Sequence, residues 1–237
     1  MKKILFAKYN RTRREEYQIS TCIYEDDTGC YVEKVALNQK ALQHINDFEK
    51  KYMGLKEIYK TMKLLKPNVL KDRVIFNYIK GVTVDGFLMK YVTNINSLVE
   101  QIKTVISNTY VYNDDYVIDF YKTEDFVTVF GDIGNLSCRA LKITNIDTIF
   151  DNIMIQGEEL YCLDYEWVFD FPIPLDYSIY RSLLYFYNKY NAYISESMTC
   201  KTFIAEFGYN LEIQETYWNM EDNFQQYVQG RNRCYIY

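Results

Sequence analysis

The chain has 237 residues, of which 49% are hydrophobic and 17% aromatic, and its formal net charge is −5. This composition supports a sizeable core and excludes a disordered chain, and the acidic balance excludes nonspecific nucleic-acid binding as the main role. Six scattered cysteines and one histidine disfavour a Cys/His metal site and indicate a reduced, cytosolic protein. No apolar run approaches about 18 residues, so we expect no transmembrane segment, and the start is too polar for a signal peptide.

In chain order, the first part of the sequence predicts three strands, a helix and two further strands. Alternating apolar residues and turn residues indicate the strands. Apolar residues at helical spacing indicate the helix, with Asn38 as its N-cap. The expected strands are 4–8, 17–25, 31–37, 62–65 and 73–79, and the expected helix runs from 38 to about 52.

The rest of the chain reads as mainly helical. Apolar residues recur at helical spacing over 95–106, 180–190 and 211–228. We therefore expect an α+β protein with a small five-stranded antiparallel N-terminal lobe carrying one helix, and a mainly helical C-terminal lobe.

One stretch, residues 145–176, carries a spacing that phosphoryl transfer would explain. Asp147 is followed five positions later by Asn152, and an apolar strand, Leu160 to Leu163, then leads to Asp164 after a turn near Gly157. In protein kinases, one Asp stands five residues before a metal-binding Asn, and a second metal-binding Asp follows. The first Asp receives the proton of the acceptor hydroxyl, whereas the Asn and the second Asp are hard oxygen ligands for Mg²⁺.

The residues after Asp164 add a second pattern. The run Asp164-Tyr165-Glu166-Trp167 is followed by Asp176, twelve positions beyond Asp164. This resembles the aminoglycoside and choline phosphotransferase branch of the kinase-like fold. The resemblance implies that Asp176 lies on a helix and holds the backbone of the catalytic loop, and that Glu166 adds a carboxylate near the metal.

The predicted strand order places Lys34 on the third strand and suggests a role for it in nucleotide binding. In a kinase, the lysine of the third strand reaches the nucleotide phosphates and pairs with a helix glutamate. Lys34 shares its strand face with Val32 and Ala36, where a cation needs a partner, and Glu49 is the helix acid that we would pair with it. The alternative is an edge-strand lysine and a solvated glutamate.

The first hairpin departs from the kinase pattern. It has no glycine-rich loop, and its turn instead holds Arg11, Arg13 and Arg14. Guanidinium groups bind phosphate in a bidentate manner and could replace the missing backbone cradle, although a solvated basic turn is the alternative. Asn145 and Ile146 also stand where kinases have His and Arg before the catalytic Asp.

A closer resemblance covers nearly the whole chain. The segments KYNRTRREEYQISTCIYE, VEKVALNQKALQHI, TNIDTIFDNIMI, LDYEWVFDFPIPLDYSIYR and MEDNFQQYVQG are similar to the kinase domain of bacterial surface-polysaccharide enzymes, the kinase/methyltransferases that terminate O-antigen chains. The resemblance implies an N-lobe at 1–80, a C-lobe at 81–237, and the use of ATP and Mg²⁺ to phosphorylate a glycan end.

The same resemblance assigns roles to individual residues. It places catalysis at Asp147, metal binding at Asn152 and Asp164, and nucleotide contacts at Lys34 and the hinge. Asn77 and Ile79 are the expected hinge contacts, with Glu49, Arg11 and Arg13 as further nucleotide-binding candidates.

The resemblance also suggests a setting and partners. A saccharide acceptor and other polysaccharide-assembly enzymes are the expected partners, either in the cytoplasm or at the inner face of the membrane. The chain lacks the methyltransferase part of such relatives, so it is expected to be a stand-alone kinase or a fragment.

Two alternatives stay open: a pseudokinase that serves as a binding or scaffold module, and a small-metabolite kinase. A protein acceptor is disfavoured because only eleven residues separate Asp164 from Asp176, too few for a long activation segment. Trp167 and Tyr165 could face a sugar ring, although core packing is the simpler interpretation of Trp167.

Overall fold

A computed structural model describes residues 2–230 of the chain. Its contacts divide it into two compact units that are not continuous in sequence. The first unit holds residues 2–53, Leu65–Lys80 and the described residues from Asp222 onward; the second holds Gly54–Leu64 and Gly81–Glu221. Residues 54–64 thus belong to the second unit and residues 222–230 to the first, whereas the sequence predicted a single division after residue 80. The predicted lobe boundary stays a prediction.

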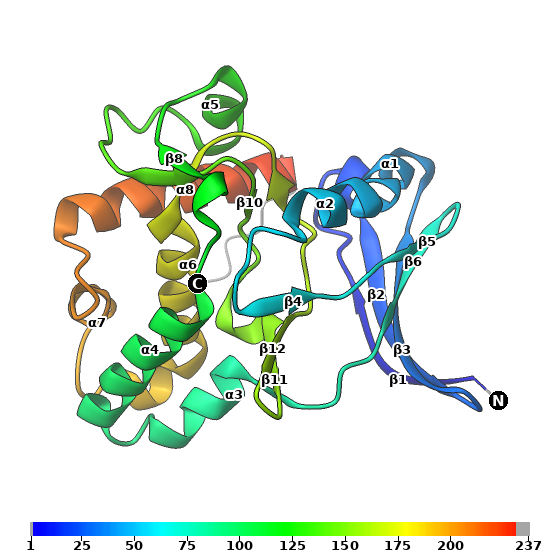
Figure 1. Ribbon diagram of the computed structural model, residues 1–237, viewed down its shortest axis with the longest axis horizontal. Coiled ribbons are helices and arrows are strands. Elements are labelled where there is room, and N and C mark those ends of the chain that lie inside the picture. Colours follow the sequence, from blue (N-terminus) through cyan, green and yellow to red (C-terminus); the bar gives the residue numbers. More distant parts are fainter. Residues whose placement is uncertain (1, 231–237) are drawn as a thin grey trace. The chain divides into compact units, whose positions relative to one another are not determined.

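The first unit is built on a five-stranded antiparallel sheet with the order β1-β2-β3-β6-β5 (Figure 1). Its strands are β1 (Lys3–Tyr9), β2 (Ile19–Asp26), β3 (Gly29–Ala36), β5 (Asn68–Val69) and β6 (Arg73–Asn77). The expected α+β class and the five-stranded antiparallel sheet are confirmed. The expected strand at 62–65 was wrongly placed in this sheet: β4 (Met62–Leu64) belongs to the second unit, and β5 supplies the fifth strand.

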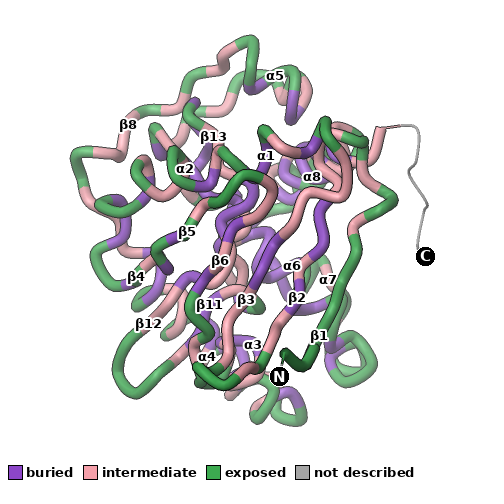
Figure 2. Tube along the Cα trace, turned by 90° about the vertical axis from the view of Figure 1, so that its right-hand side faces the viewer, coloured by how far each residue is buried: buried purple, intermediate pink, exposed green. Residues whose placement is uncertain are grey.

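The core of the first unit lies on one side of this sheet, under the expected helical segment. Ile19, Val74 and Phe76 from the strands and Ile45 and Phe48 from the helices are almost completely buried. The edge strand β1, in contrast, is exposed at every residue (Figure 2). The sheet therefore hides its central strands and leaves its first strand open to solvent.

The helical segment of the first unit begins as predicted. Asn38 caps it by accepting hydrogen bonds from the N–H groups of Lys40 and Ala41. It is divided into a 3₁₀ turn, η2 (Gln39–Ala41), and two short helices, α1 (Leu42–Asn46) and α2 (Phe48–Leu55).

The second unit contains three small sheets. Their strand orders are β4-β12-β11-β7, β10-β13 and β14-β9-β8. Their strands are β4 (Met62–Leu64), β7 (Val82–Thr83), β8 (Val117–Asp119), β9 (Arg139–Leu141), β10 (Thr144–Asn145), β11 (Ile153–Gln156), β12 (Glu159–Cys162), β13 (Val168–Phe169) and β14 (Ile173–Pro174). The β4–β12 pairing is parallel, and the β11–β12 pairing is the predicted hairpin. Gly157 turns this hairpin with a φ of 62°, which glycine adopts without strain.

Helices are the main regular secondary structure of the second unit, as expected from the sequence. They are α3 (Val84–Leu88), α4 (Ile95–Thr109), α5 (Glu124–Phe130), α6 (Leu175–Ile194), α7 (Cys200–Ala205) and α8 (Leu211–Gln229), the last of which continues into the first unit. The remaining 3₁₀ turns are η1 (Glu15–Tyr17), η3 (Met89–Tyr91), η4 (Asp114–Tyr116) and η5 (Phe150–Asn152). Helix α6 is buried along most of its length. Within residues 2–230 we find no helix whose length and apolar character would let it cross a membrane.

Candidate active site

The segment singled out in the sequence forms one connected structure in the second unit. After β10 the chain makes the η5 turn and enters the β11–β12 hairpin. The N–H of Asn152 donates to the carbonyl of Ile149 at 2.8 Å, and the N–H of Leu163 donates to the carbonyl of Asn152 at 2.8 Å. The second of these bonds extends the hairpin by one step beyond the Ile153–Cys162 pair. Asn152 and Asp164 therefore lie at the same open end of the hairpin, opposite Gly157.

Asn145 joins the two predicted aspartates. Its side chain is 1% exposed, and its Nδ2 donates to the backbone carbonyl of Asp164 at 2.9 Å. Its Oδ1 accepts the backbone N–H of Asp147 at 3.1 Å. A buried amide that satisfies one donor and one acceptor fixes the two backbones relative to each other. Asn145 is thus the residue that brings Asp147 and Asp164 together.

One end of the Asn152 side-chain amide is fixed by a hydrogen bond. Its Nδ2 donates to the backbone carbonyl of Asp147 at 2.9 Å, and this contact decides which end of the amide carries the NH₂ group. The Oδ1 consequently points away from that carbonyl. Asp164 lies beside it, with its Oδ1 accepting the N–H of Glu166 at 3.1 Å.

These two side chains fit a magnesium ion that is completed by other ligands. An amide oxygen and a carboxylate oxygen are hard donors, and Mg²⁺ commonly takes one or two protein oxygens together with water and phosphate oxygens. Within residues 2–230, no three His, Cys, Asp or Glu side chains gather closely enough to hold a metal by themselves. The donor set is therefore suited to a metal that arrives with a phosphate ligand.

The carboxylate of Asp147 is held from two sides and is 15% exposed. Its Oδ2 accepts the backbone N–H of Trp167 at 3.3 Å, and its Oδ1 lies 3.6 Å from Nη1 of Arg181. Arg181 also donates to the carbonyl of Ile146 and forms a buried ion pair with Glu221, with Nε 2.6 Å from Oε2. Ile146 stands where kinases carry an arginine, and here Arg181 of α6 brings a guanidinium to the same loop.

The expectation for Asp176 holds for its place on a helix but is wrong for its contact with the loop backbone. It lies in the first turn of α6 and is exposed, and the contacts of α6 with the catalytic loop come from residues farther along the helix. Arg181 binds the carbonyl of Ile146, and Ser182 donates to the carbonyl of Thr148 at 3.2 Å. The hydroxyl of Tyr110 donates to the same carbonyl at 2.8 Å. One and a half turns of helix separate Asp176 from these residues, so its side chain serves another environment.

A second charged network supports the other end of the loop. Nζ of Lys189 lies 2.5 Å from Oδ2 of Asp85 and 2.9 Å from Oδ2 of Asp151, the neighbour of Asn152. The hydroxyl of Tyr190 donates to Asp85 at 2.9 Å. Burial alone would raise the pKa of Asp85, but hydrogen bonds led by the one from Lys189 outweigh it and lower that pKa to about 2. Asp85 is therefore a fixed anion that anchors Lys189 and, through it, η5.

The aromatic residues next to Asp164 belong to the core. Tyr165 is 0% exposed and Trp167 is 6% exposed, so neither ring is available to stack on a sugar, and core packing is the better interpretation of both. Glu166 is also buried, at 3% exposed. Glu166 therefore stays a candidate for a carboxylate near the metal, whereas the two aromatic side chains do not line an acceptor site.

In the first unit, the structure buries Lys34 but not Glu49. Lys34 on β3 is 3% exposed, with its Nζ 5.7 Å from the centre of the Phe48 ring. Glu49 is exposed on α2, and no ion pair among the described residues joins it to Lys34. The buried cation is thus in place on its strand, and the pair with Glu49 is not formed.

The basic turn between β1 and β2 is held by side-chain amides. Nε2 of Gln18 donates to the carbonyls of Arg11 at 3.2 Å and Arg13 at 2.9 Å, and Asn38 in turn binds Oε1 of Gln18 at 3.2 Å. Arg13 donates to the carbonyl of Tyr17 at 3.5 Å, and Arg11 is exposed beside the ring of Tyr9. Thr21 pairs with Lys34 and with Lys8, next to Tyr9 at the end of β1. Lys34 and the turn therefore lie toward the same end of the sheet.

The predicted hinge residues follow β6. Asn77 is the last residue of that strand and is exposed, and Ile79 is half-buried two positions later. Gly81, which begins the second unit here, needs to be glycine: an added Cβ would lie 2.2 Å from the backbone oxygen of Ile155. The chain therefore enters the second unit through a position where only a hydrogen fits.

Sequence reasoning missed the residues that hold the loop from a distance. Arg181 is one example: it is the only basic residue between Asp176 and Lys189, in a helix that is otherwise apolar and aromatic. A charge in a buried helix face requires a partner, so its position was a usable signal. Its partner Glu221 lies 40 residues away, and nothing local indicates that pairing.

Comparisons with known proteins give structural similarity only. Neither a protein-family model nor a curated protein matches the chain. Macrolide 2′-phosphotransferase from Brachybacterium faecium is similar in structure, with a TM-score of 0.43 and 9% identity over 91% of this chain and 82% of that one. Macrolide 2′-phosphotransferase type I has a TM-score of 0.47 and 10% identity over 93% of this chain and 84% of that one. Ethanolamine kinase from Plasmodium vivax has a TM-score of 0.45 and 10% identity over 93% of this chain and 75% of that one. At these values the assignment of function rests on the residues described above.

Proposed function

We propose that the chain is an ATP- and Mg²⁺-dependent phosphotransferase that acts on a hydroxyl group. The observation that carries this proposal is the tie made by Asn145. It connects the backbones of Asp147 and Asp164 at 3.1 and 2.9 Å, while Asn152 is turned by its own hydrogen bond to Asp147. A proton acceptor and two hard oxygen ligands at one loop are the parts that phosphoryl transfer requires.

Each residue has a distinct role in this proposal. Asp147 orients the acceptor hydroxyl and takes its proton, and Arg181 keeps the loop backbone that carries Asp147 in place. Asn152 and Asp164 hold Mg²⁺, which when bound neutralises the charge of the phosphates. Catalysis of phosphate transfer to a hydroxyl depends mainly on positioning and charge stabilisation, so a rigid loop contributes more to the rate than an activated nucleophile does.

The first unit contributes the nucleotide contacts in the same proposal. Lys34 binds the phosphates as a buried cation, and Asn77 and Ile79 contact the base. Arg11 and Arg13 bind phosphate in place of a glycine-rich loop, supported by Gln18 holding their carbonyls at 3.2 and 2.9 Å. Guanidinium groups are well suited to this role because they present several fixed donors.

The first test is linkage between ligand binding and stability. A ligand at a hundredfold excess over its Kd stabilises a fold by about 2.7 kcal/mol, so Mg·ATP should raise the melting temperature. Asp164→Ala should remove the metal-dependent part of this rise. Asp147→Ala should keep the rise and lose phosphate transfer. Metal-dependent stabilisation that survives Asp164→Ala would remove Asp164 from the metal site.

The basic turn is tested separately. If Arg11 and Arg13 bind phosphate, changing both to Ala should weaken ATP at least tenfold and leave adenosine binding nearly unchanged. Arg139→Ala is a matched control, because Arg139 is an exposed arginine of the second unit that pairs with Asp119. Equal losses for ATP and adenosine would mean that the turn does not touch phosphate.

For the acceptor, we propose a hydroxyl of a saccharide, in particular the end of a surface polysaccharide. The sequence resemblance to O-antigen-terminating kinases suggests this class. The connection from Asp164 to α6 supports a small acceptor, because β13 pairs with β10 and β14 pairs with β9 within it. Such a short segment, tied into two sheets, is poorly suited to hold an extended peptide.

Radiolabelled ATP with a panel of acceptors distinguishes the possibilities. Oligosaccharides stand beside generic protein substrates, an aminoglycoside, a macrolide and ethanolamine. Labelling of saccharides supports the proposal, and labelling of a small amine or antibiotic alone would favour a small-metabolite kinase. Binding of Mg·ATP with no transfer to any acceptor would favour a pseudokinase that serves as a binding module.

A further inference from the structure

A cavity of about 550 Å³ lies between helices α6, α7 and α8 of the second unit. Tyr180 and Leu184 of α6, Ile204 of α7 and Leu211 of α8 contribute apolar walls. None of residues 145–176 lines it, so it is separate from the proposed phosphoryl-transfer residues. Its volume lies within the range of about 300–1,000 Å³ of small-molecule sites, which are mainly apolar and carry a few placed polar groups.

Trp218 of α8 presents an open ring at this cavity. It lines the cavity and is 53% exposed, whereas the other tryptophan of the chain, Trp167, is buried. Among residues 2–230, no other ring or cation packs on the indole of Trp218. Leaving so large an apolar surface in water is unfavourable. The indole is therefore available to cover an apolar face of a ligand.

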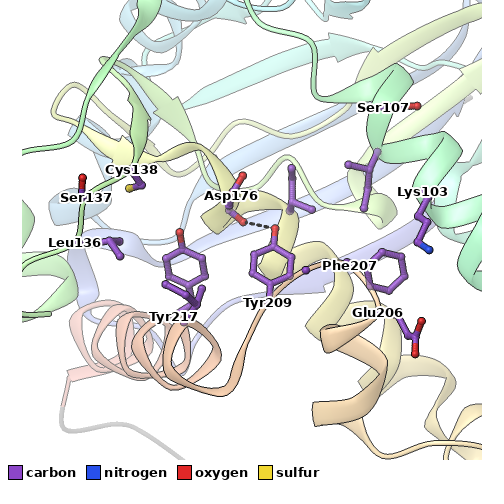
Figure 3. A pocket seen from close by; sticks show the side chains of 14 residues that line it. Lys103, Ser107, Leu136, Ser137, Cys138, Asp176, Glu206, Phe207, Tyr209 and Tyr217 are labelled. Atoms are coloured by element: carbon purple, nitrogen blue, oxygen red, sulfur yellow. Dashed lines mark hydrogen bonds between the residues drawn. The ribbon is translucent and has the colours of Figure 1, made fainter.

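A second cavity of the same unit, of about 470 Å³, differs in this respect (Figure 3). Its tyrosines, Tyr209 and Tyr217, are buried, and their ring centres lie 6.2 Å apart. The hydroxyl of Tyr209 also donates to the backbone carbonyl of Asp176 at 3.1 Å. These rings pack on each other rather than facing a ligand, which sets the cavity beside Trp218 apart.

Gln214 supplies a hydrogen-bond acceptor to the cavity that Trp218 lines. It is 6% exposed, and its Nε2 donates to the carbonyls of Tyr209 at 2.8 Å and Lys201 at 3.1 Å. These two bonds use both amide hydrogens and fix which end of the amide is the oxygen. Oε1 accepts no hydrogen bond from residues 2–230, yet it is not sealed off, since in that range only Oγ1 of Thr144 is both buried and without a partner. Oε1 is therefore accessible, and the open space beside Gln214 is this cavity.

Two charged side chains of opposite sign stand at the rim. Lys201 of α7 and Glu215 of α8 line the cavity and are exposed, and neither side chain forms an ion pair within the described part of the chain. Such a rim favours neither an anion nor a cation. Lys201 donates hydrogen bonds and Glu215 accepts them, and a hydroxyl group can serve both because it donates and accepts.

We propose that this cavity is a binding site for a neutral saccharide. The apolar C–H face of a sugar ring lies on the indole of Trp218. Its hydroxyl groups donate to Oε1 of Gln214 and to Glu215, and accept from Lys201. A purely apolar ligand would leave Oε1 of Gln214 without a donor, which is unfavourable for a group removed from water. The proposal does not rest on the proposed phosphotransferase activity, because it concerns binding away from the catalytic loop.

The test follows the indole N–H signals of the two tryptophans by NMR, in the full chain at pH 7 without nucleotide. Maltotriose, cellotriose and mannotriose are titrated beside sorbitol, which has hydroxyl groups but no rigid ring, and adenosine, which has a flat base. We expect the Trp218 signal, assigned with Trp218→Phe, to shift with one or more trisaccharides and the Trp167 signal to stay in place. No shift with any trisaccharide, an equal shift with sorbitol, or a shift with adenosine alone would overturn the proposal.

Variants, compared by calorimetry, assign the binding to the cavity. Trp218→Ala should weaken the trisaccharide by about tenfold or more and Trp218→Phe by less than about threefold, whereas Tyr121→Ala, at an exposed aromatic residue of the same unit, should have no effect. Glu215→Gln keeps an acceptor and removes the charge, so it should be nearly neutral; a loss of about tenfold would refute a neutral ligand. Unchanged binding in Trp218→Ala with a normal melting temperature would refute the assignment. No nucleotide is present, so a failed phosphotransfer assay would leave this result unaffected.

Discussion

Replacing Arg181 tests the support of the catalytic loop. Arg181 is 3% exposed and Glu221 is 7% exposed, and their side chains form an ion pair 2.6 Å long. Arg181→Met keeps most of the side-chain volume but takes the cation away from a buried carboxylate. Breaking a buried pair in this way costs about 3–5 kcal/mol, a large share of the roughly 5–15 kcal/mol that stabilises a typical domain.

The measurement can be confined to the second unit. Both tryptophans of the chain, Trp167 and Trp218, lie there, so their fluorescence reports the unfolding of that unit in urea. With a slope of about 3 kcal/mol per molar urea, we expect the midpoint to fall by about 1 M or more. Arg139→Met is the control, because Arg139 and Asp119 form an exposed pair worth about 1 kcal/mol or less.

A double-mutant cycle completes this test. The pair Arg181→Met and Glu221→Leu should cost clearly less than the sum of the two single changes, because the double variant removes the buried Glu221 carboxylate that Arg181→Met alone leaves without its partner. Loss of phosphate transfer in Arg181→Met should exceed the loss expected from unfolding alone, since Asp147 would lose its guanidinium neighbour. Additive single changes, or a destabilisation no larger than that of Arg139→Met, would refute the role of Arg181.

Three further predictions concern single positions in the second unit. Gly81→Ala should lower the free energy of unfolding of this unit by about 1–3 kcal/mol in urea, because the new Cβ would meet the carbonyl of Ile155. Gly54→Ala is the control and should be neutral or stabilising, because its Cβ would lie at an ordinary 3.5 Å from a side chain. Thr144→Val should be tolerated or stabilising in the same assay, because Oγ1 of Thr144 is buried and has no hydrogen-bond partner within residues 2–230. Asp85, whose pKa is lowered to about 2 from 3.8, should contribute about 2 kcal/mol of stability above pH 4 that disappears as the pH falls toward 2; Asp85→Asn should flatten this acid dependence, and an unchanged acid profile would contradict it.

The parts of the fold that the sequence could predict are those set by local pattern. Asn38 caps its helix and Gly157 turns its hairpin as expected, because both depend on residues a few positions away. The strand at Met62–Leu64 was recognised but assigned to the wrong sheet. Its partner, β12, is almost a hundred residues distant, and a short apolar strand carries no information about which sheet it joins.

For the candidate site, too, the sequence could predict the residues that are close in the chain but not those that reach the loop from elsewhere. The spacing of Asp147, Asn152 and Asp164 indicated that these residues lie near one another, and one loop and one hairpin do bring them together. Their catalytic and metal-binding roles stay predictions. The side chains that hold this loop could not be found by spacing, since Arg181 and Lys189 reach it from α6. Asp176 was given the supporting role by resemblance, but Arg181, five positions farther along the helix, makes the contact.

The use of Asn145 has a consequence for how activity depends on pH. A histidine in this place would lose or gain a proton near neutrality and would alter its hydrogen bonds as it did so. An amide has no such equilibrium, so the hydrogen bonds of Asn145 to the backbones of Asp147 and Asp164 do not change with acidity. The one histidine of the chain, His44, lies in the first unit beside Tyr17. If the proposed phosphate transfer is measured, any acid limb in its rate profile should therefore report carboxylates or the substrate, and the loop should keep its geometry in mildly acidic solution.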